Sequence, residues 1–147
     1  MKKTLQNILV LGAKSDIAAA TARLYAEQSC ALTLAARETE SLEKIKEDLL
    51  IRGSVNVDLL EVNLESVKSI KSFLKNLDPL PDLVLCAVGY LGEQSRTEKD
   101  FKEMERVIKA NLTGPAMIFE TLAQSMMERG YGAVSYTHLT LPTICSV

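Results

Sequence analysis

The sequence predicts an α/β fold in which one parallel β-sheet is covered by helices on both faces. Three observations support this prediction. Short apolar runs alternate with amphipathic helical segments, most of these runs lack polar positions, and the 147 residues suffice for one hydrophobic core. Because crossovers between parallel strands are right-handed, we expect the sheet to be doubly wound.

Two strand–helix units form the first half of the chain. Residues 7–11 predict a buried first strand, and helical spacing over 17–25 predicts the helix that follows it. Residues 31–35 predict the second strand. The apolar positions of 42–49 lie on one face of a charged segment and predict a helix that ends near Gly53.

The second half of the chain continues the alternation. Residues 55–62 predict a third strand, 67–77 a third helix and 83–89 a fourth buried strand. A polar loop at 91–99 then leads into helical spacing over 104–129. We therefore expect a Rossmann-type doubly wound sheet that is truncated after about the fourth or fifth strand.

Composition and residue counts narrow the classes of function. Hydrophobic residues make up 47% of the chain, charged residues 24%, and the net charge is −2, so we expect no membrane span and no nucleic-acid partner. Cys30, Cys86 and Cys145 are widely spaced and odd in number, which indicates a reducing, cytoplasmic location. His138 has no neighbouring ligand set, so no metal site is expected.

The turn after the first strand is a candidate phosphate-binding site. Gly12 allows a tight turn, and the helix that begins nearby offers unpaired N–H groups. The candidate cofactor-binding residues here are Gly12, Ala13, Ser15, Asp16 and Ile17. Because Asp16 brings a negative charge, we expect its side chain to cap its own helix. An ordinary strand–turn–helix connection is the alternative.

Arg37, at the end of the second strand, bears on the choice of cofactor. An acidic residue at this position would accept hydrogen bonds from the adenosine ribose of NAD, whereas an arginine suits the 2′-phosphate of NADP. We therefore expect NADP, with NAD as the less favoured cofactor. The alternative interpretation is an ordinary surface arginine at a strand end.

Three further stretches, taken with these residues, resemble the short-chain dehydrogenase/reductase family over residues 7 to about 134. Asn63-Leu64 follows the third strand, Cys86-Ala87-Val88-Gly89 follows the fourth, and Asn111 lies in the long helix. The resemblance implies that Asn63 and Leu64 lie beside adenine, and that Ala87 and Gly89 leave room for the nicotinamide ribose. It implies a catalytic role for Asn111 in a proton relay. The alternative is a buried amide that satisfies backbone groups at a helix kink.

The last residues depart from the family. A serine should end the fifth strand and a Tyr-x-x-x-Lys pair should follow, but Thr140 stands four residues after Tyr136. Residues 134–147 resemble instead the translation of an adapter used to prepare DNA sequencing libraries. We expect residues 1–133 to be an incomplete NAD(P)-binding domain, residues 134–147 to be an artefactual tail, and the fourth strand to lie at or near an edge.

For the parent protein, the resemblance implies an oxidoreductase that transfers a hydride between NADP(H) and the carbonyl or secondary alcohol of a small-molecule substrate. A narrower resemblance of Gly12–Ala18 and residues 111–115 is to reductases of a keto-sugar lipid. The family also implies homo-oligomers that pair through residues 100–129. We expect the chain as given to be marginally stable and inactive. Two alternatives stay open: a methyltransferase on a similar sheet, and a non-catalytic NADP-binding or interaction module.

Overall fold

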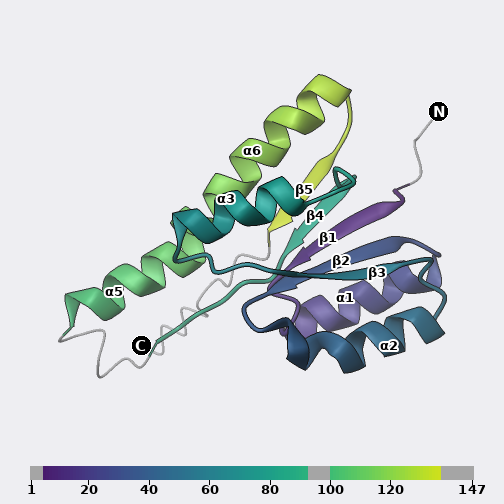
Figure 1. Cartoon of the computed structure of the whole chain (residues 1–147), viewed down its shortest axis with the longest axis horizontal. Coiled ribbons are helices and arrows are strands. Elements are labelled where there is room, and N and C mark those ends of the chain that lie inside the picture. The colour runs from purple at the N-terminus through teal and green to yellow at the C-terminus, as the bar shows by residue number, and fades with distance from the viewer. Residues whose placement is uncertain (1–4, 93–99, 137–147) are drawn as a thin grey trace, which may run out of the picture.

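The computed structural model describes residues 5–92 and 100–136, which form a five-stranded parallel sheet flanked by helices (Figure 1). The strand order is β3-β2-β1-β4-β5, and every pairing is parallel. The strands are β1 (Asn7–Leu11), β2 (Ala31–Ala36), β3 (Val57–Glu61), β4 (Leu83–Cys86) and β5 (Ala133–Tyr136). The predicted parallel α/β sheet is confirmed.

Helices cover both faces of the sheet, as Figure 1 shows: α1 and α2 lie on one face, and α3 and α6 lie on the other. The helices are α1 (Asp16–Glu27), α2 (Glu43–Ile51), α3 (Val67–Asn76), α5 (Phe101–Ile108) and α6 (Gly114–Arg129). A 3-10 turn, Thr39–Leu42, precedes α2. The sheet is therefore doubly wound.

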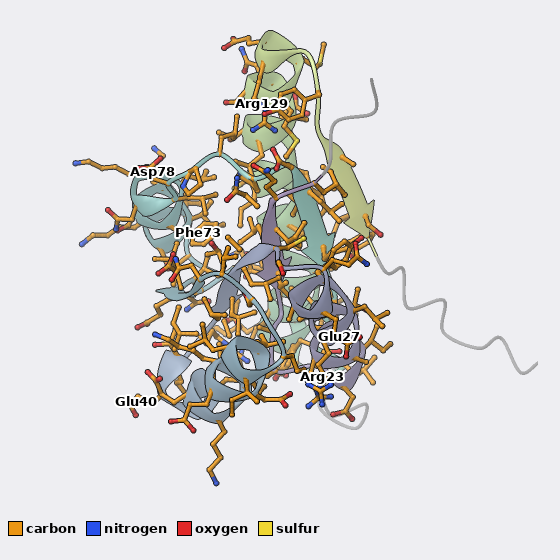
Figure 2. The ribbon with its side chains drawn as sticks, turned by 90° about the vertical axis from the view of Figure 1, so that its right-hand side faces the viewer. Arg23, Glu27, Glu40, Phe73, Asp78 and Arg129 are labelled. Carbon is orange, nitrogen blue, oxygen red and sulfur yellow. The ribbon has the colours of Figure 1, made fainter. Side chains whose placement is uncertain are left out.

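The central strand β1 contributes to two separate hydrophobic cores. Ile8 and Val10 pack with the α1 and α2 side, whereas Leu9 and Leu11 pack with the α3 and α6 side, and all four are at most 1% exposed. Phe73 of α3 fills the second core, between its helix and the sheet (Figure 2). This two-sided burial explains why the strand is a continuous apolar run in the sequence.

The order of the strands creates a switch point beside β1. The chain first extends the sheet from β1 through β2 to β3, then returns to place β4 and β5 on the other side of β1. The loops that follow β1 and β4 therefore diverge at the carboxyl ends of neighbouring strands. In open α/β sheets ligands bind in the crevice at such a switch point.

The structure corrects one expectation at the start of α1 and agrees with another on the fourth strand. Ser15, not Asp16, is the N-cap of α1, because its backbone is extended (φ −71°, ψ 139°) and its carbonyl accepts the first helical hydrogen bond, from the Ala19 N–H (2.9 Å). Asp16 is the first helical residue and is exposed. The fourth strand lies near an edge, as expected: β5 pairs with it from Leu83↔Ala133 to Cys86↔Tyr136 and is itself the edge strand.

The long helix expected over 104–129 is divided. A π-helical segment, Lys109–Thr113, separates α5 from α6 and contains Asn111. The strand β5 extends through Tyr136, so it crosses the boundary expected at residue 133. All four residues of β5 are exposed. His138, Cys145 and the remainder of 137–147 lie outside the described residues, as do residues 93–99 of the expected polar loop.

Within the described part of the chain, no helix is long and apolar enough to cross a membrane. The same residues contain no group of three or more side chains of the kinds that commonly bind metal ions. Cys30 and Cys86 are both buried.

Candidate functional site

A cavity of about 490 Å³ opens at the carboxyl ends of β1, β2, β3 and β4. Seven of the predicted cofactor-binding residues line it: Gly12, Ser15, Arg37, Asn63, Leu64, Ala87 and Gly89. The other three predicted residues of the first turn, Ala13, Asp16 and Ile17, are absent from its lining. The structure therefore gathers residues from four separate loops at the switch point of the sheet.

Gly12 brings the loops after β1 and β4 together. Its φ of +75° is in the left-handed region, which favours glycine. A Cβ atom at this position would lie 2.9 Å from the carbonyl carbon and oxygen of Ala87 and from the backbone nitrogen of Val88. Because those atoms belong to the backbone, they cannot move aside cheaply. The close approach of these loops at the cavity therefore requires glycine.

The start of α1 supplies backbone donors beside the cavity. The Ala13 N–H donates to the Ala35 carbonyl (3.3 Å), and that of Ser15 is used within the turn, so these two donors serve the fold. The N–H groups in the first turn of a helix have no partner within the helix, and those of Asp16 and Ile17 belong to this turn. The Ser15 side chain makes no capping bond to α1. Such a helix end favours a bound anion.

Two ion pairs flank the cavity. Lys14 Nζ lies 3.2 Å from Glu38 Oε2, and Arg37 Nη1 lies 3.2 Å from Glu65 Oε1. All four residues line the cavity. The second carboxylate oxygen of Glu65 lies 2.9 Å from Arg106 Nε on α5. The cations at this rim therefore have carboxylate partners in the structure.

The loop after β3 forms another wall of the cavity. Asn63 Oδ1 accepts a hydrogen bond from the Glu65 N–H (3.0 Å), and the Asn63 N–H donates to Ser69 Oγ (2.9 Å). Leu64 lies against Gly114, where a Cβ atom would come within 2.7 Å of the Leu64 Cβ. The loop is thus fixed from α3 on one side and from the start of α6 on the other.

Asn111 fixes the loop after β4. Its Oδ1 accepts from the Tyr90 N–H (2.7 Å), and its Nδ2 donates to the Tyr90 carbonyl (2.6 Å). The Asn111 carbonyl accepts a hydrogen bond from the Tyr136 hydroxyl (2.5 Å). This arrangement matches the interpretation of an amide that satisfies backbone groups where the helix is interrupted. The catalytic role of Asn111 stays a prediction.

Several charged or aromatic side chains of the site were not predicted from the sequence, among them Glu65, Tyr90, Glu103 and Arg106. The Tyr90 hydroxyl donates to Glu103 Oε1 (2.5 Å), and the Arg106 guanidinium lies 4.7 Å from the centroid of the Tyr90 ring. The bond to Glu103 is the main cause that raises the pKa of Tyr90. Glu65 and Arg106 are 41 residues apart in sequence, and no local pattern marks either one.

A glycine turn, a helix N-terminus and an arginine after β2, gathered at the switch point of a doubly wound sheet, define a nucleotide-binding domain of the Rossmann type. Residues 6–137 match the profile of the short chain dehydrogenase family, and the chain belongs to this family.

Several characterised and uncharacterised oxidoreductases are similar to the chain. An uncharacterised oxidoreductase of Thermotoga maritima is 28% identical over 86% of this chain and 50% of its own length. Glycine betaine reductase of Emericella nidulans is 32% identical over 86% of this chain but 10% of its own length. Sulfoacetaldehyde reductase 2 of Chromohalobacter salexigens is 29% identical over 86% and 51%. The chain therefore spans about half or less of the relatives it matches.

Solved structures share the fold. A short-chain dehydrogenase from Sphingobium yanoikuyae in complex with NADPH has a TM-score of 0.80 at 22% identity, covering 90% of this chain and 53% of that one. A 3-oxoacyl-[acyl-carrier protein] reductase with bound NAD from Brucella melitensis has a TM-score of 0.78 at 20% identity, covering 89% and 52%. Since one neighbour holds NADPH and the other NAD, the likeness does not choose between the cofactors.

Proposed function

We propose that this chain is the cofactor-binding part of an NADP-dependent oxidoreductase, which in full-length form transfers a hydride between NADP(H) and the carbonyl or secondary alcohol of a small-molecule substrate. The observation that carries the proposal is the position of Arg37 at the rim of the cavity, directly after β2, with Lys14 lining the same cavity. An arginine at this position suits a 2′-phosphate. The reductases among the relatives support the reaction class.

The residues that line the cavity fit each part of this cofactor. Gly12 lines the cavity where the loops after β1 and β4 meet, and the start of α1 offers N–H donors to a diphosphate bound beside this turn. Arg37 would hold the 2′-phosphate, while Asn63 and Leu64 would flank the adenine. Ala87 and Gly89, with small side chains or none, leave room for the nicotinamide ribose. When bound, the nicotinamide ring supplies or accepts the hydride.

Acid–base chemistry is the part of the reaction that we assign to residues beyond this chain. The four tyrosines are followed, four residues later, by Ser29, Gln94, Ser135 and Thr140, so the chain contains no Tyr-x-x-x-Lys pair. We propose that the chain binds cofactor without turnover and that residues 134–147 are not part of the native domain. Substrate would then be held by the part of the parent protein that follows, and a keto-sugar lipid is one candidate.

The surface of α5 and α6 supports the proposal that the parent protein forms homo-oligomers through residues 100–129. Phe101 is 87% exposed, Leu112 is 63% exposed and Met127 is 81% exposed. Large apolar side chains on neighbouring helices favour burial against a second surface.

Three alternatives differ in their support. Membership in the short chain dehydrogenase family argues against the methyltransferase. NAD is favoured over NADP by one observation, the carboxylate of Glu38 beside Arg37 at the cavity, because a carboxylate can accept hydrogen bonds from a ribose. A non-catalytic NADP-binding module would have the same cavity and would differ in lacking the catalytic pair in its full-length gene.

Titration of the protein with NADPH and with NADH tests the proposal. The chain contains no tryptophan, so nicotinamide fluorescence can be followed without interference from that residue. We expect NADPH to bind more tightly, and Arg37→Gln to weaken NADPH binding by about tenfold or more while NADH binding stays the same, because a charge-assisted bond to phosphate is lost. Arg52→Gln, at the end of α2, is the matched control.

Each other outcome has a distinct meaning. Tighter binding of NADH than of NADPH would favour the NAD alternative. Binding of neither nucleotide would contradict the proposed function. Hydride transfer by the chain alone would contradict the assignment of acid–base chemistry to residues beyond it.

A further inference from the structure

Glu65 is placed between two arginines from different elements. Its Oε1 lies 3.2 Å from Nη1 of Arg37, which follows β2, and its Oε2 lies 2.9 Å from Nε of Arg106 on α5. The Glu65 side chain is 22% exposed, whereas those of the two arginines are 49% and 40% exposed. The carboxylate is thus the most shielded member of this group, and it divides its charge between two guanidinium groups.

The backbone of Glu65 is also held in place. Its N–H donates to Asn63 Oδ1 (3.0 Å), and the Asn63 N–H in turn donates to Ser69 Oγ (2.9 Å) at the start of α3. Because the loop is fixed, the side chain cannot leave Arg37 by a movement of the whole loop. The Glu65 carboxylate can still shift between the guanidinium groups of Arg37 and Arg106.

The other ion pair at the rim differs in exposure. The Glu38 side chain is 85% exposed and contacts Lys14 at 3.2 Å. A pair so open to water is screened, and its members separate at little cost. Glu65 is shielded and fixed, so its carboxylate competes more strongly for its cation than Glu38 does.

We propose that Glu65 determines how strongly the site discriminates between a 2′-phosphate and a 2′-hydroxyl, because its carboxylate competes with the phosphate for Arg37. The inference rests on the proposed function, in which Arg37 receives the 2′-phosphate. Arg106 is a positioning residue in this scheme. By attracting Glu65 toward α5, it leaves more of the Arg37 guanidinium free for phosphate.

The proposal predicts effects of opposite sign for the two partners. The quantity to measure is the ratio of the dissociation constants for NADH and NADPH, obtained by fluorescence titration. Glu65→Gln removes the competing charge, so NADPH binding tightens about fivefold while NADH binding stays nearly unchanged. Arg106→Gln directs Glu65 entirely to Arg37, so NADPH binding weakens by a similar factor.

The double variant distinguishes this mechanism from a simple change in local charge. If Arg106 acts through Glu65, adding Arg106→Gln to the Glu65→Gln protein leaves the ratio unchanged. If Arg106 attracts the phosphate directly, the same loss appears in both backgrounds, and the positioning role is wrong. Glu128→Gln is the control for net charge, since Glu128 is an exposed residue near the end of α6, away from the cavity.

The outcomes separate this inference from the proposed function. If the unaltered protein binds neither nucleotide, both are wrong. If it binds NADPH through Arg37 but Glu65→Gln leaves the ratio unchanged, the proposed function stands and the inference is wrong. Should Glu65→Gln fail to fold, as judged by circular dichroism, Arg106→Gln can still overturn the inference, because the inference is wrong if NADPH and NADH binding weaken equally or if neither changes.

Discussion

Charged side chains are more buried at the amino-terminal end of the sheet than at its carboxyl-terminal end. At the amino-terminal end, Asp82 is 5% exposed, and its Oδ2 accepts hydrogen bonds from the backbone N–H groups of Gln6 (2.8 Å) and Asn7 (3.0 Å). Arg129, at the end of α6 (Figure 2), lies 3.3 Å from Asp82 Oδ1 and donates to the carbonyls of Leu80 and Pro81. These bonds tie α6 to the segments that precede β1 and β4.

At the carboxyl-terminal end, the ion pairs of the cavity rim are more exposed and join loops rather than the bodies of elements. The Lys14 side chain is 40% exposed and that of Arg37 is 49% exposed. Neither pair is enclosed by backbone donors, as Asp82 is. Charges at the amino-terminal end are therefore positioned to hold the fold together, whereas those at the carboxyl-terminal end can exchange a carboxylate for a ligand.

The largest expected effect comes from comparing two glycines, one at each end. Gly12 and Gly130 both have positive φ, +75° and +85°, but only Gly12 is crowded: a Cβ at Gly130 would meet nothing within 4 Å. We expect Gly12→Ala to lower the free energy of unfolding by about 3–4 kcal/mol and to abolish nucleotide binding, since strain and overlap add. Gly130→Ala should cost about 1 kcal/mol.

Urea unfolding of both variants, followed by circular dichroism, checks this pair. The contrast depends on crowding rather than on φ. Equal losses at the two sites would mean that the approach of the loops after β1 and β4 is not tight, and that the cavity does not depend on it.

The fold was largely predictable because short stretches of sequence indicate each strand and helix. Residues 7–11 are apolar throughout, since β1 is buried on both faces, and Gly12 ends the strand as expected. The boundaries differed by a few residues, as in β3, which was expected over 55–62 and spans Val57–Glu61. The π-helical segment around Asn111 had no sequence signal of its own, and only a helix kink at Asn111 was considered as an alternative.

The residues of the candidate site were predictable only where the sequence of a single loop after a strand indicates their role. Gly12, Arg37 and Asn63 each follow a strand, so their meeting at one edge follows from a parallel sheet. The partner of Arg37 was not predictable, because Glu65 reaches it from a loop 28 residues further along the chain. The sequence left open whether a fifth strand pairs with β4 for a related reason: the two strands lie about 50 residues apart, and only the tertiary fold brings them together.

The next effect in size compares carboxylates at the two ends. Asp82→Asn keeps the shape of the side chain but directs an N–H group toward the donors of Gln6, Asn7 or Arg129. We expect a loss of about 2–3 kcal/mol in the free energy of unfolding, because buried donors lose their acceptor. Glu38→Gln, at the exposed rim, should leave the urea midpoint unchanged within error. A comparable loss for both variants would remove the distinction between the two ends.

The smallest effect concerns two buried thiols, Cys86 at the carboxyl end of β4 and Cys30 just before β2. Burial raises the pKa of the Cys86 thiol from 9.0 to about 11, and burial followed by the charge of Asp82 raises that of Cys30. A raised pKa means that the folded state retains the proton longer than the unfolded state. The contribution of the protonated Cys86 thiol to the free energy of unfolding is therefore fully present below pH 9, and it is lost as the pH rises through about 11.

Unfolding in urea with a reductant at pH 9 and at pH 11 measures this loss. The unaltered protein should lose about 2 kcal/mol more than Cys86→Ala over this interval, because only the unaltered protein has a buried thiol at position 86 to ionise on unfolding. The less enclosed Cys30 should give a smaller difference for Cys30→Ala. If the free energy of unfolding falls as steeply with pH in Cys86→Ala as in the unaltered protein, the thiol ionises as readily in the folded state as in the unfolded one. The carboxyl end of β4 would then be open to water, and the tight contact of its loop with Gly12 would need revision.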